Sequence, residues 1–195
     1  MKIAILSDVH ENSHNLILAL KTIEEKECEQ ILFLGDFMNN GIAKFFASFK
    51  IPTFAVWGNN DGERAMITKT SLTPGSNLTV SDSVYDFVEF EGKKIFITHY
   101  PDIARSMAKS GDFDAVFCGH SHEKSEEKIG NCLLVNPGEI SAHKTGEATF
   151  AIWDTEENKV EFITLENSIT LLTKEVEEFR KNIDFVYSHT KRHKK

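Results

Sequence analysis

The sequence contains few cysteines and no long apolar run. Its three cysteines, Cys28, Cys118 and Cys132, are an odd number without CxxC spacing, so they predict neither a disulfide framework nor a thiolate zinc site. No apolar run approaches the roughly 20 residues that cross a bilayer. An Asp already stands at position 8, which leaves no room for the apolar region of a signal peptide. We therefore expect a cytoplasmic protein with reduced thiols and no membrane contact.

Positive charge is also scarce. The 22 Lys and Arg residues are outnumbered by 30 Asp and Glu residues, which gives a formal net charge of -8. This balance disfavours the broad phosphate-binding surface on which nonspecific nucleic-acid binding depends. We expect instead a small substrate, or one that is gripped locally. The 195 residues, 41% of them hydrophobic, suffice for one well-buried core and are short for two full domains.

Short apolar runs alternate with helical patterns at the start of the chain. The runs that predict buried strands are "KIAILS" (2–7), "QILFLG" (30–35) and "TFAVWG" (53–58). Between them, "NLILALKTIEEKE" and "GIAKFFASF" have helical periodicity. An order of strand, helix, strand, helix, strand indicates an α/β fold.

Further strands follow in the second half of the sequence. They are predicted at "SVYDFVEF", "KKIFITH", "DAVFCG" and "CLLVNPG", with "IARSMAKSG" as a helix between the second and third. Later, "EATFAIWD" and "KVEFITL" flank "TEEN", a strong signal for a hairpin. We expect this late hairpin to belong to a second, antiparallel or mixed sheet that packs on the first.

The chain changes character after about residue 167. An apolar stripe at helical spacing predicts an amphipathic helix, and it consists of Leu172, Val176, Phe179, Ile183 and Val186. The last five residues, "KRHKK", indicate a solvated basic tail. We therefore divide the chain into a domain at 1–167 and a helix with tail at 168–195. Packing of this helix on its own domain is favoured over a dimer helix, although a homodimer stays open.

Asp, Asn and His side chains follow the ends of the predicted strands. They occur in "SDVHEN", "GDFMNN", "GNND", "ITHYP" and "CGHSH". Because loops at the carboxyl ends of parallel strands meet at one crevice of an open sheet, we expect these five segments to converge. Any one of them alone would be a weak signal, but five in order indicate a site.

The residue types in these loops predict a metal centre. Seven side chains are candidate ligands: Asp8, His10, Asp36, Asn59, His99, His120 and His122. A single catalytic zinc takes about three protein ligands, so seven suit two ions that share a bridging carboxylate and a bridging water. Imidazole, carboxylate and amide ligands suit Mn²⁺, our first choice, or Ni²⁺, Fe²⁺ and Zn²⁺.

The motifs "SDVH", "GD", "GNND", "TH" and "GHSH", with "NPG" after them, resemble those of the calcineurin-like metallophosphoesterases, and more narrowly the small YfcE-type phosphodiesterases, to which Vps29 is related. The resemblance implies a four-layer α/β/β/α sandwich of two facing mixed sheets. It also implies that Asp8, His10 and His122 hold one ion, that Asn59, His99 and His120 hold the other, and that Asp36 bridges both.

We therefore predict a dinuclear metal-dependent phosphodiesterase that hydrolyses small molecules by attack of a metal-bridging hydroxide. The expected catalytic residues are Asp36, Asn59 and His99. Asn60 is expected to contact substrate, at a position where larger members of the family have His. Asn12 either contacts phosphate or caps a turn. The alternatives are a catalytically silent Vps29-like scaffold that binds proteins, and a phosphomonoesterase or nuclease of the same superfamily.

Overall fold

The structure is a computed structural model that describes residues 1–171. Its strands are β1 (Lys2–Leu6), β2 (Gln30–Phe33), β3 (Thr53–Ala55), β4 (Leu78–Val80), β5 (Tyr85–Phe90), β6 (Lys93–Thr98), β7 (Ala115–Phe117), β8 (Ser125–Ile129), β9 (Cys132–Asn136), β10 (Thr149–Asp154) and β11 (Lys159–Thr164). Its helices are α1 (Ser13–Glu25), α2 (Asn40–Ser48), α3 (Arg64–Ser71) and α4 (Pro101–Ser110). None of these helices within residues 1–171 has the length and apolar character that a membrane crossing requires.

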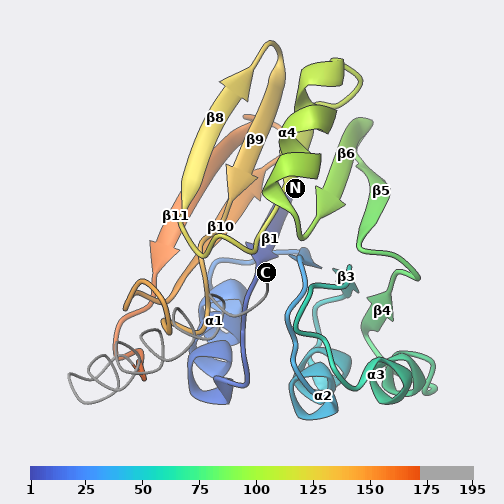
Figure 1. Ribbon diagram of the computed structural model, residues 1–195, viewed down its shortest axis with the longest axis vertical. Coiled ribbons are helices and arrows are strands. Elements are labelled where there is room, and N and C mark those ends of the chain that lie inside the picture. Colours follow the sequence, from blue (N-terminus) through green and yellow to red (C-terminus); the bar gives the residue numbers. More distant parts are fainter. Residues whose placement is uncertain (172–195) are drawn as a thin grey trace, which may run out of the picture.

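The strands form two mixed sheets. The first has the order β11-β10-β1-β2-β3-β4 and the second the order β5-β6-β7-β9-β8. Strands β1 to β4 run parallel to one another, as do β6, β7 and β9, while β5, β8 and β10 pair antiparallel with their neighbours. Figure 1 shows α1, α2 and α3 together on one side of the molecule and α4 on the other.

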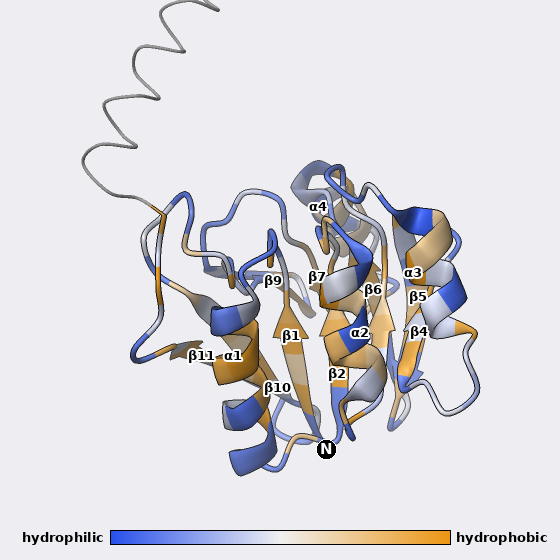
Figure 2. Cartoon of the chain, turned by 90° about the horizontal axis from the view of Figure 1, so that it is seen from below, coloured by the Kyte–Doolittle hydropathy of each residue, from blue (hydrophilic) through white to orange (hydrophobic). Residues whose placement is uncertain are grey.

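Alternate residues of β1 face different cores, which explains why the run is apolar throughout. Ala4 and Leu6 face the core beneath α1 and α2, whereas Ile3 and Ile5 pack between the two sheets. A third core lies between α4 and the outer face of the second sheet. A strand buried on both faces reads as a continuous hydrophobic run, and these strands appear orange in Figure 2. The predicted four-layer α/β/β/α sandwich is thus confirmed.

Two expectations about the elements need correction. The predicted hairpin β10–β11 exists, but it extends the first sheet, because β10 pairs antiparallel with the edge of β1 that β2 leaves open. Alternation within a hairpin cannot reveal which sheet edge it joins. In addition, α3, β4 and β8 were not predicted; β8 is exposed along most of its length, so it lacks an apolar signal.

The boundary placed at residue 167 stays a prediction, and the amphipathic helix and basic tail lie outside the described residues. Within the described part, the chain beyond β11 is tied to α1 by Asn15. The buried Asn15 side chain donates to the carbonyls of Ile140 (2.8 Å) and Ile169 (2.9 Å) and accepts from the Ile169 amide (2.8 Å). One amide group therefore joins three segments that are distant in the sequence.

Asn15→Ala is expected to lower the free energy of unfolding by about 2–4 kcal/mol, because it removes the Asn15 partner of the Ile140 carbonyl and of the Ile169 amide, while the Ile169 carbonyl keeps only its bond from Asn12. Urea denaturation of the full chain measures this. The matched control is Ile17→Ala on the same helix, where the side chain is 39% exposed and the loss should stay below about 1 kcal/mol. Equal losses in the two variants would show that the Asn15 hydrogen bonds contribute nothing beyond helix propensity.

Candidate metal centre

The loops that follow five strands meet at one edge of the sandwich. Asp8 and His10 follow β1, Asp36 follows β2 and Asn59 follows β3, all in the first sheet, whereas the loops after β6 and β7 of the second sheet carry His99, His120 and His122. The expectation that a single open sheet supplies all five loops is therefore wrong. The strands that carry the loops are divided between two sheets packed face to face, so the site straddles both.

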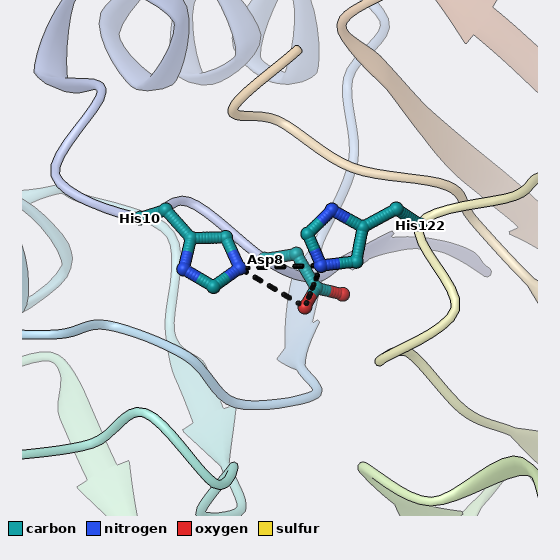
Figure 3. A group of neighbouring side chains, drawn as sticks. All are labelled: Asp8, His10 and His122. Atoms are coloured by element: carbon teal, nitrogen blue, oxygen red, sulfur yellow. Dashed lines mark hydrogen bonds and ion pairs between the residues drawn. The ribbon is translucent and has the colours of Figure 1, made fainter. Parts of the chain in front are cut away.

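The first group of candidate ligands is Asp8, His10 and His122 (Figure 3). The Oδ1 atom of Asp8 lies 3.5 Å from His10 Nε2 and 3.3 Å from His122 Nε2, and the two Nε2 atoms are 3.3 Å apart. Ligands about 2.1 Å from a common ion are separated by about 3.0 Å in octahedral and about 3.4 Å in tetrahedral geometry. The three atoms therefore have the spacing of ligands around one cation.

The hydrogen bonds around this group leave acceptors facing one another. His122 Nδ1 lies 2.7 Å from a carboxylate oxygen of Glu139, to which it must donate, so Nε2 of the neutral ring presents a lone pair. Asp8 Oδ1 is buried and has no hydrogen-bond donor within residues 1–171. A buried carboxylate oxygen that meets the lone pair of His122 is costly unless a cation lies between them. This donor set therefore fits a divalent metal ion.

A second group is formed by Asn59, His99 and His120. Asn59 Oδ1 lies 3.0 Å from His99 Nε2 and 2.8 Å from His120 Nδ1. His99 Nδ1 donates to the Leu34 carbonyl at 2.8 Å, so Nε2 of the neutral ring is again an acceptor that faces an acceptor oxygen. The facing acceptors of His99 and Asn59 thus also fit a cation, although Asn59 and His120, unlike Asp8, are exposed to solvent.

Asp36 lies between the two groups. Its Oδ2 atom is 3.4 Å from His10 Nε2 and 3.6 Å from His99 Nε2, which are members of different groups. Asp8 is also near the second group, because its carboxylate lies within 4.8 Å of ligand atoms of Asp36 and His99. Asn60 orients the Asp36 carboxylate by donating from its backbone amide to Oδ1 (2.8 Å) and from its side-chain Nδ2 to Oδ2 (2.9 Å).

Five of the seven candidate ligands adopt left-handed backbone conformations. The φ angles are 57° for Asp8, 43° for His10, 65° for Asp36, 67° for His120 and 68° for His122. Asp and His are among the few residues other than Gly that occur in this region with any frequency, and each such residue costs of order 1 kcal/mol or more. Backbone strain is therefore concentrated where the candidate ligands are.

Two glycines of the motifs allow the loops to approach closely. A Cβ atom on Gly58 would lie 2.1 Å from Asp36 Oδ1, and one on Gly119 would lie 1.9 Å from Ser7 Oγ. No side chain larger than hydrogen fits at either position without displacing the neighbouring loop. The glycines of "GNND" and "GHSH" thus bring the ligand loops together rather than merely ending strands.

The charges of the site shift its protonation equilibria. Burial alone would raise the pKa of the Asp8 carboxyl, but contact with His10 and the nearby His99 and His122 outweigh it and hold that pKa below its usual value. Burial lowers the pKa of His10, yet Asp8 and Asp36 together raise it above 6.5. Burial, and then His99, lower the pKa of His120.

The predicted substrate contacts differ in how they are engaged. Asn12 is the N-cap of α1: its side chain accepts from the Asn15 amide, and Nδ2 donates to the carbonyls of Ser141 and Ile169. Both amide hydrogens of Asn12 are thus used within the protein. The Asn60 side chain is exposed and bonded to Asp36. His14, in the first turn of α1, is exposed, and its Nε2 atom lies 3.1 Å from the Asn167 carbonyl oxygen.

Two acidic residues were missed as parts of the site. Asp61 accepts hydrogen bonds from the backbone amides of Gly58 (2.7 Å), Asp36 (3.2 Å) and Met38 (3.2 Å). It therefore joins the loop after β2 to the loop after β3. Burial raises the pKa of Asp61, and these bonds partly offset it. Glu139 contacts His122 and is fully buried. Its only signal in the sequence is its place after "NPG".

A cleft of about 740 Å³ adjoins the first group, and His10 and His122 form part of its wall. Met38, Ile169 and Leu171 give the wall apolar surface, while Lys144 adds a positive charge and Glu11 a negative one. The size lies within the range of small-molecule sites, about 300–1,000 Å³.

Comparison with known proteins places these observations in a family context. The calcineurin-like phosphoesterase superfamily domain matches residues 1–158. A phosphodiesterase of Methanocaldococcus jannaschii is 33% identical over 168 residues, which are 85% of this chain and 100% of the relative. The solved structure of an archaeal phosphodiesterase has a TM-score of 0.75 at 32% identity and covers 85% of this chain and 100% of its own. YfcE, a phosphoesterase from E. coli, shares the fold with a TM-score of 0.62, 18% identity, and coverage of 85% and 100%.

In the metal-free protein, His10 is expected to titrate above pH 6.5 and His120 below it, as measured by NMR titration of the imidazole carbon-bound protons. The protonated His10 ring therefore stabilises the metal-free fold fully below pH 6.5, and this contribution is lost as the pH rises through the raised pKa. Asp8→Asn should lower the His10 pKa by about one unit, whereas Asp112→Asn on the exposed surface should not. If His10 titrates below His120, the carboxylates do not dominate the site.

Proposed function

The chain belongs to the calcineurin-like phosphoesterase superfamily, and on that premise we propose that it is a dinuclear metal-dependent phosphodiesterase of small molecules. The observation that carries this proposal is the convergence of acceptor atoms in two groups around Asp36. Its carboxylate oxygen lies 3.4 Å from His10 and 3.6 Å from His99. Two cations that share this carboxylate would satisfy every ligand of both groups.

The distances support one allocation of ligands. In this allocation Asp8, His10 and His122 would hold the first ion, Asn59, His99 and His120 would hold the second, and Asp36 would serve both. This allocation gives each imidazole of "GHSH" to a different ion. Mn²⁺ is the first choice, with Ni²⁺, Fe²⁺ and Zn²⁺ as alternatives, since imidazole, carboxylate and amide ligands suit all four.

The charge balance explains how an acidic protein attracts phosphate. Two divalent ions would bring four positive charges, whereas the ligands Asp8 and Asp36 bring two negative ones. The ions and their direct ligands would thus carry a net positive charge, which the nearby carboxylates of Asp61 and Glu139 reduce. When bound, the ions supply Lewis acidity at the phosphoryl group and acidify a water molecule. Such a centre would attract a small anion locally. An extended polyanion would also meet the rest of the chain, whose net charge of -8 repels it.

The side chains of the site hold these atoms in place before substrate arrives. Asn60 fixes the orientation of the Asp36 carboxylate through two hydrogen bonds, and the Leu34 carbonyl fixes the tautomer of His99. We assign Asp36, Asn59 and His99 as the catalytic residues, which would lie next to the phosphoryl group of the substrate. Of the two predicted substrate contacts, we retain Asn60, because it is exposed. Asn12 instead caps α1 with its side-chain oxygen and donates both amide hydrogens to the carbonyls of Ser141 and Ile169.

The cleft beside the first group favours a phosphodiester of small size. Because the cleft adjoins His10 and His122 and is partly apolar, it can receive the second ester substituent while the phosphate lies at the centre. A phosphomonoester has only one ester substituent and therefore lacks this second one. The rival function, a catalytically silent scaffold, requires neither the cleft nor two groups of converging acceptors.

Metal binding should separate the two histidines of "GHSH". The protein saturated with Mn²⁺ is expected to hold two ions, of which His122→Ala weakens the first and His120→Ala the second, because each variant removes one ligand from one ion. Anomalous scattering from crystals of each variant measures the occupancy at the two positions. Loss at the same position in both variants, or a single ion in the wild type, would contradict the allocation.

The design controls for backbone strain. His120 and His122 have nearly equal φ angles of 67° and 68°, so an Ala costs about the same at either position and a difference between the variants reports ligation. Asp36→Asn serves as the shared control. Since Asn also tolerates a positive φ, this variant should weaken both ions without a new backbone cost.

The substrate class is tested with bis(p-nitrophenyl) phosphate, p-nitrophenyl phosphate and an alkyl diester. The aryl diester should react fastest. It should exceed the alkyl diester by about 100-fold or more, because Asn60 cannot supply the proton that a general acid would give to a poor leaving group. Asp36→Asn should abolish all these activities, which excludes contaminants. Faster turnover of the monoester would identify a phosphomonoesterase instead, and no activity in the metal-loaded protein would favour the scaffold.

A further inference from the structure

Glu139 has a buried carboxylate that accepts six hydrogen bonds from side chains and backbone amides. Its side chain is inaccessible to solvent. One oxygen, Oε2, accepts from His122 Nδ1 (2.7 Å), the Ser141 hydroxyl and the His143 amide (3.1 Å). The other, Oε1, accepts from the Lys144 amide (2.9 Å) and from the amide (2.7 Å) and hydroxyl (2.8 Å) of Thr145.

The two oxygens of Glu139 therefore have different tasks. Oε1 bonds only to the loop that follows Glu139, whereas Oε2 also reaches His122 on the loop after β7. The same segment is fastened to the end of β1, because the amides of Ile140 and Ser141 donate to the carbonyls of Ser7 (3.1 Å) and Asp8 (3.0 Å). The carboxylate is thus held rigidly beside two candidate ligands of the first ion.

We propose that Glu139 is a positioning residue that fixes His122 in the tautomer required for metal binding. A carboxylate can only accept, so the bond obliges Nδ1 to carry the proton and directs the Nε2 lone pair towards Asp8 and His10. The same carboxylate holds the loop of His143 and Lys144, which lines the cleft. The proposal rests on the proposed function in one respect, which is that His122 is a ligand.

The substitution Glu139→Gln distinguishes positioning from simple anchoring. The Gln carbonyl oxygen is expected to stay with the Lys144 and Thr145 amides, since backbone amides cannot become acceptors. Its NH₂ group then faces His122 and donates to Nδ1, which inverts the tautomer and places a proton on Nε2, in the path of the first ion. The Ser141 hydroxyl can rotate to accept. The His143 amide loses Oε2 but keeps the Ser141 hydroxyl oxygen at 3.4 Å, so the loop keeps most of its bonds.

Two measurements on the full-length chain test this. In the metal-free protein, the ¹⁵N shifts of His122 should report protonated Nδ1 in the wild type and protonated Nε2 in Glu139→Gln. Titration with Mn²⁺ should then show an affinity for the first ion that is lower by about 10- to 100-fold in the variant, while the second ion, whose His99 is oriented by Leu34, binds as before.

The matched control is Thr145→Val, which removes a hydroxyl donor from Glu139 Oε1 and leaves the bond to His122 intact. It should change neither the tautomer nor the affinity for the first ion. An equal loss of affinity in Thr145→Val would overturn the proposal, because Glu139 would then act only as an anchor of the loop. Retention of the Nδ1 proton in Glu139→Gln would overturn it as well.

If Glu139→Gln does not fold, the proposal can still be tested on the wild type, because a proton on Nε2 of His122 in the metal-free protein would contradict it. Failure of this proposal is also distinguishable from failure of the proposed function. The tautomer is read without metal, whereas the proposed function fails when the wild type, with its Nδ1 proton in place, does not bind two ions.

Discussion

The convergence of hydrogen-bond acceptors at the edge of the two sheets is the constraint on which the rest of the site depends. His122 and His99 each donate through Nδ1 to Glu139 and Leu34, so the nitrogens that remain meet the oxygens of Asp8 and Asn59 as acceptors. Inside a protein, such an arrangement is unfavourable unless a cation completes it. The Asp36 carboxylate between the groups makes the two centres one electrostatic unit.

Bringing these acceptors together carries a cost in the backbone. The polypeptide must turn sharply after each strand, which explains the left-handed conformations of Asp8, Asp36 and His120. It also explains why Gly58 and Gly119 stand where any Cβ would collide with a neighbouring loop. Asp61 compensates in part, because its carboxylate accepts three backbone amides of these turns. Strain at the ligands is balanced by bonds between the loops that carry them.

Much of this could be predicted from the sequence because strand ends are local signals. Runs such as "KIAILS" and "QILFLG" are buried on both faces, and the polar residue after each run marks the edge where the site forms. What the sequence could not indicate was contact between distant elements. The pairing of β10 with β1 and the bond between Glu139 and His122 leave no periodic pattern in the sequence, because each joins segments that are distant along the chain.

The energetics of the buried acids also bear on whether the site is used. Asp8 and Asp36 are at most 1% exposed, and a buried charge without a partner costs several kcal/mol even after relaxation. A protein that served only as a scaffold would gain stability by replacing such residues with apolar ones of similar size. The two carboxylates and the left-handed backbone at His10, His120 and His122 are a stability cost that metal binding would offset.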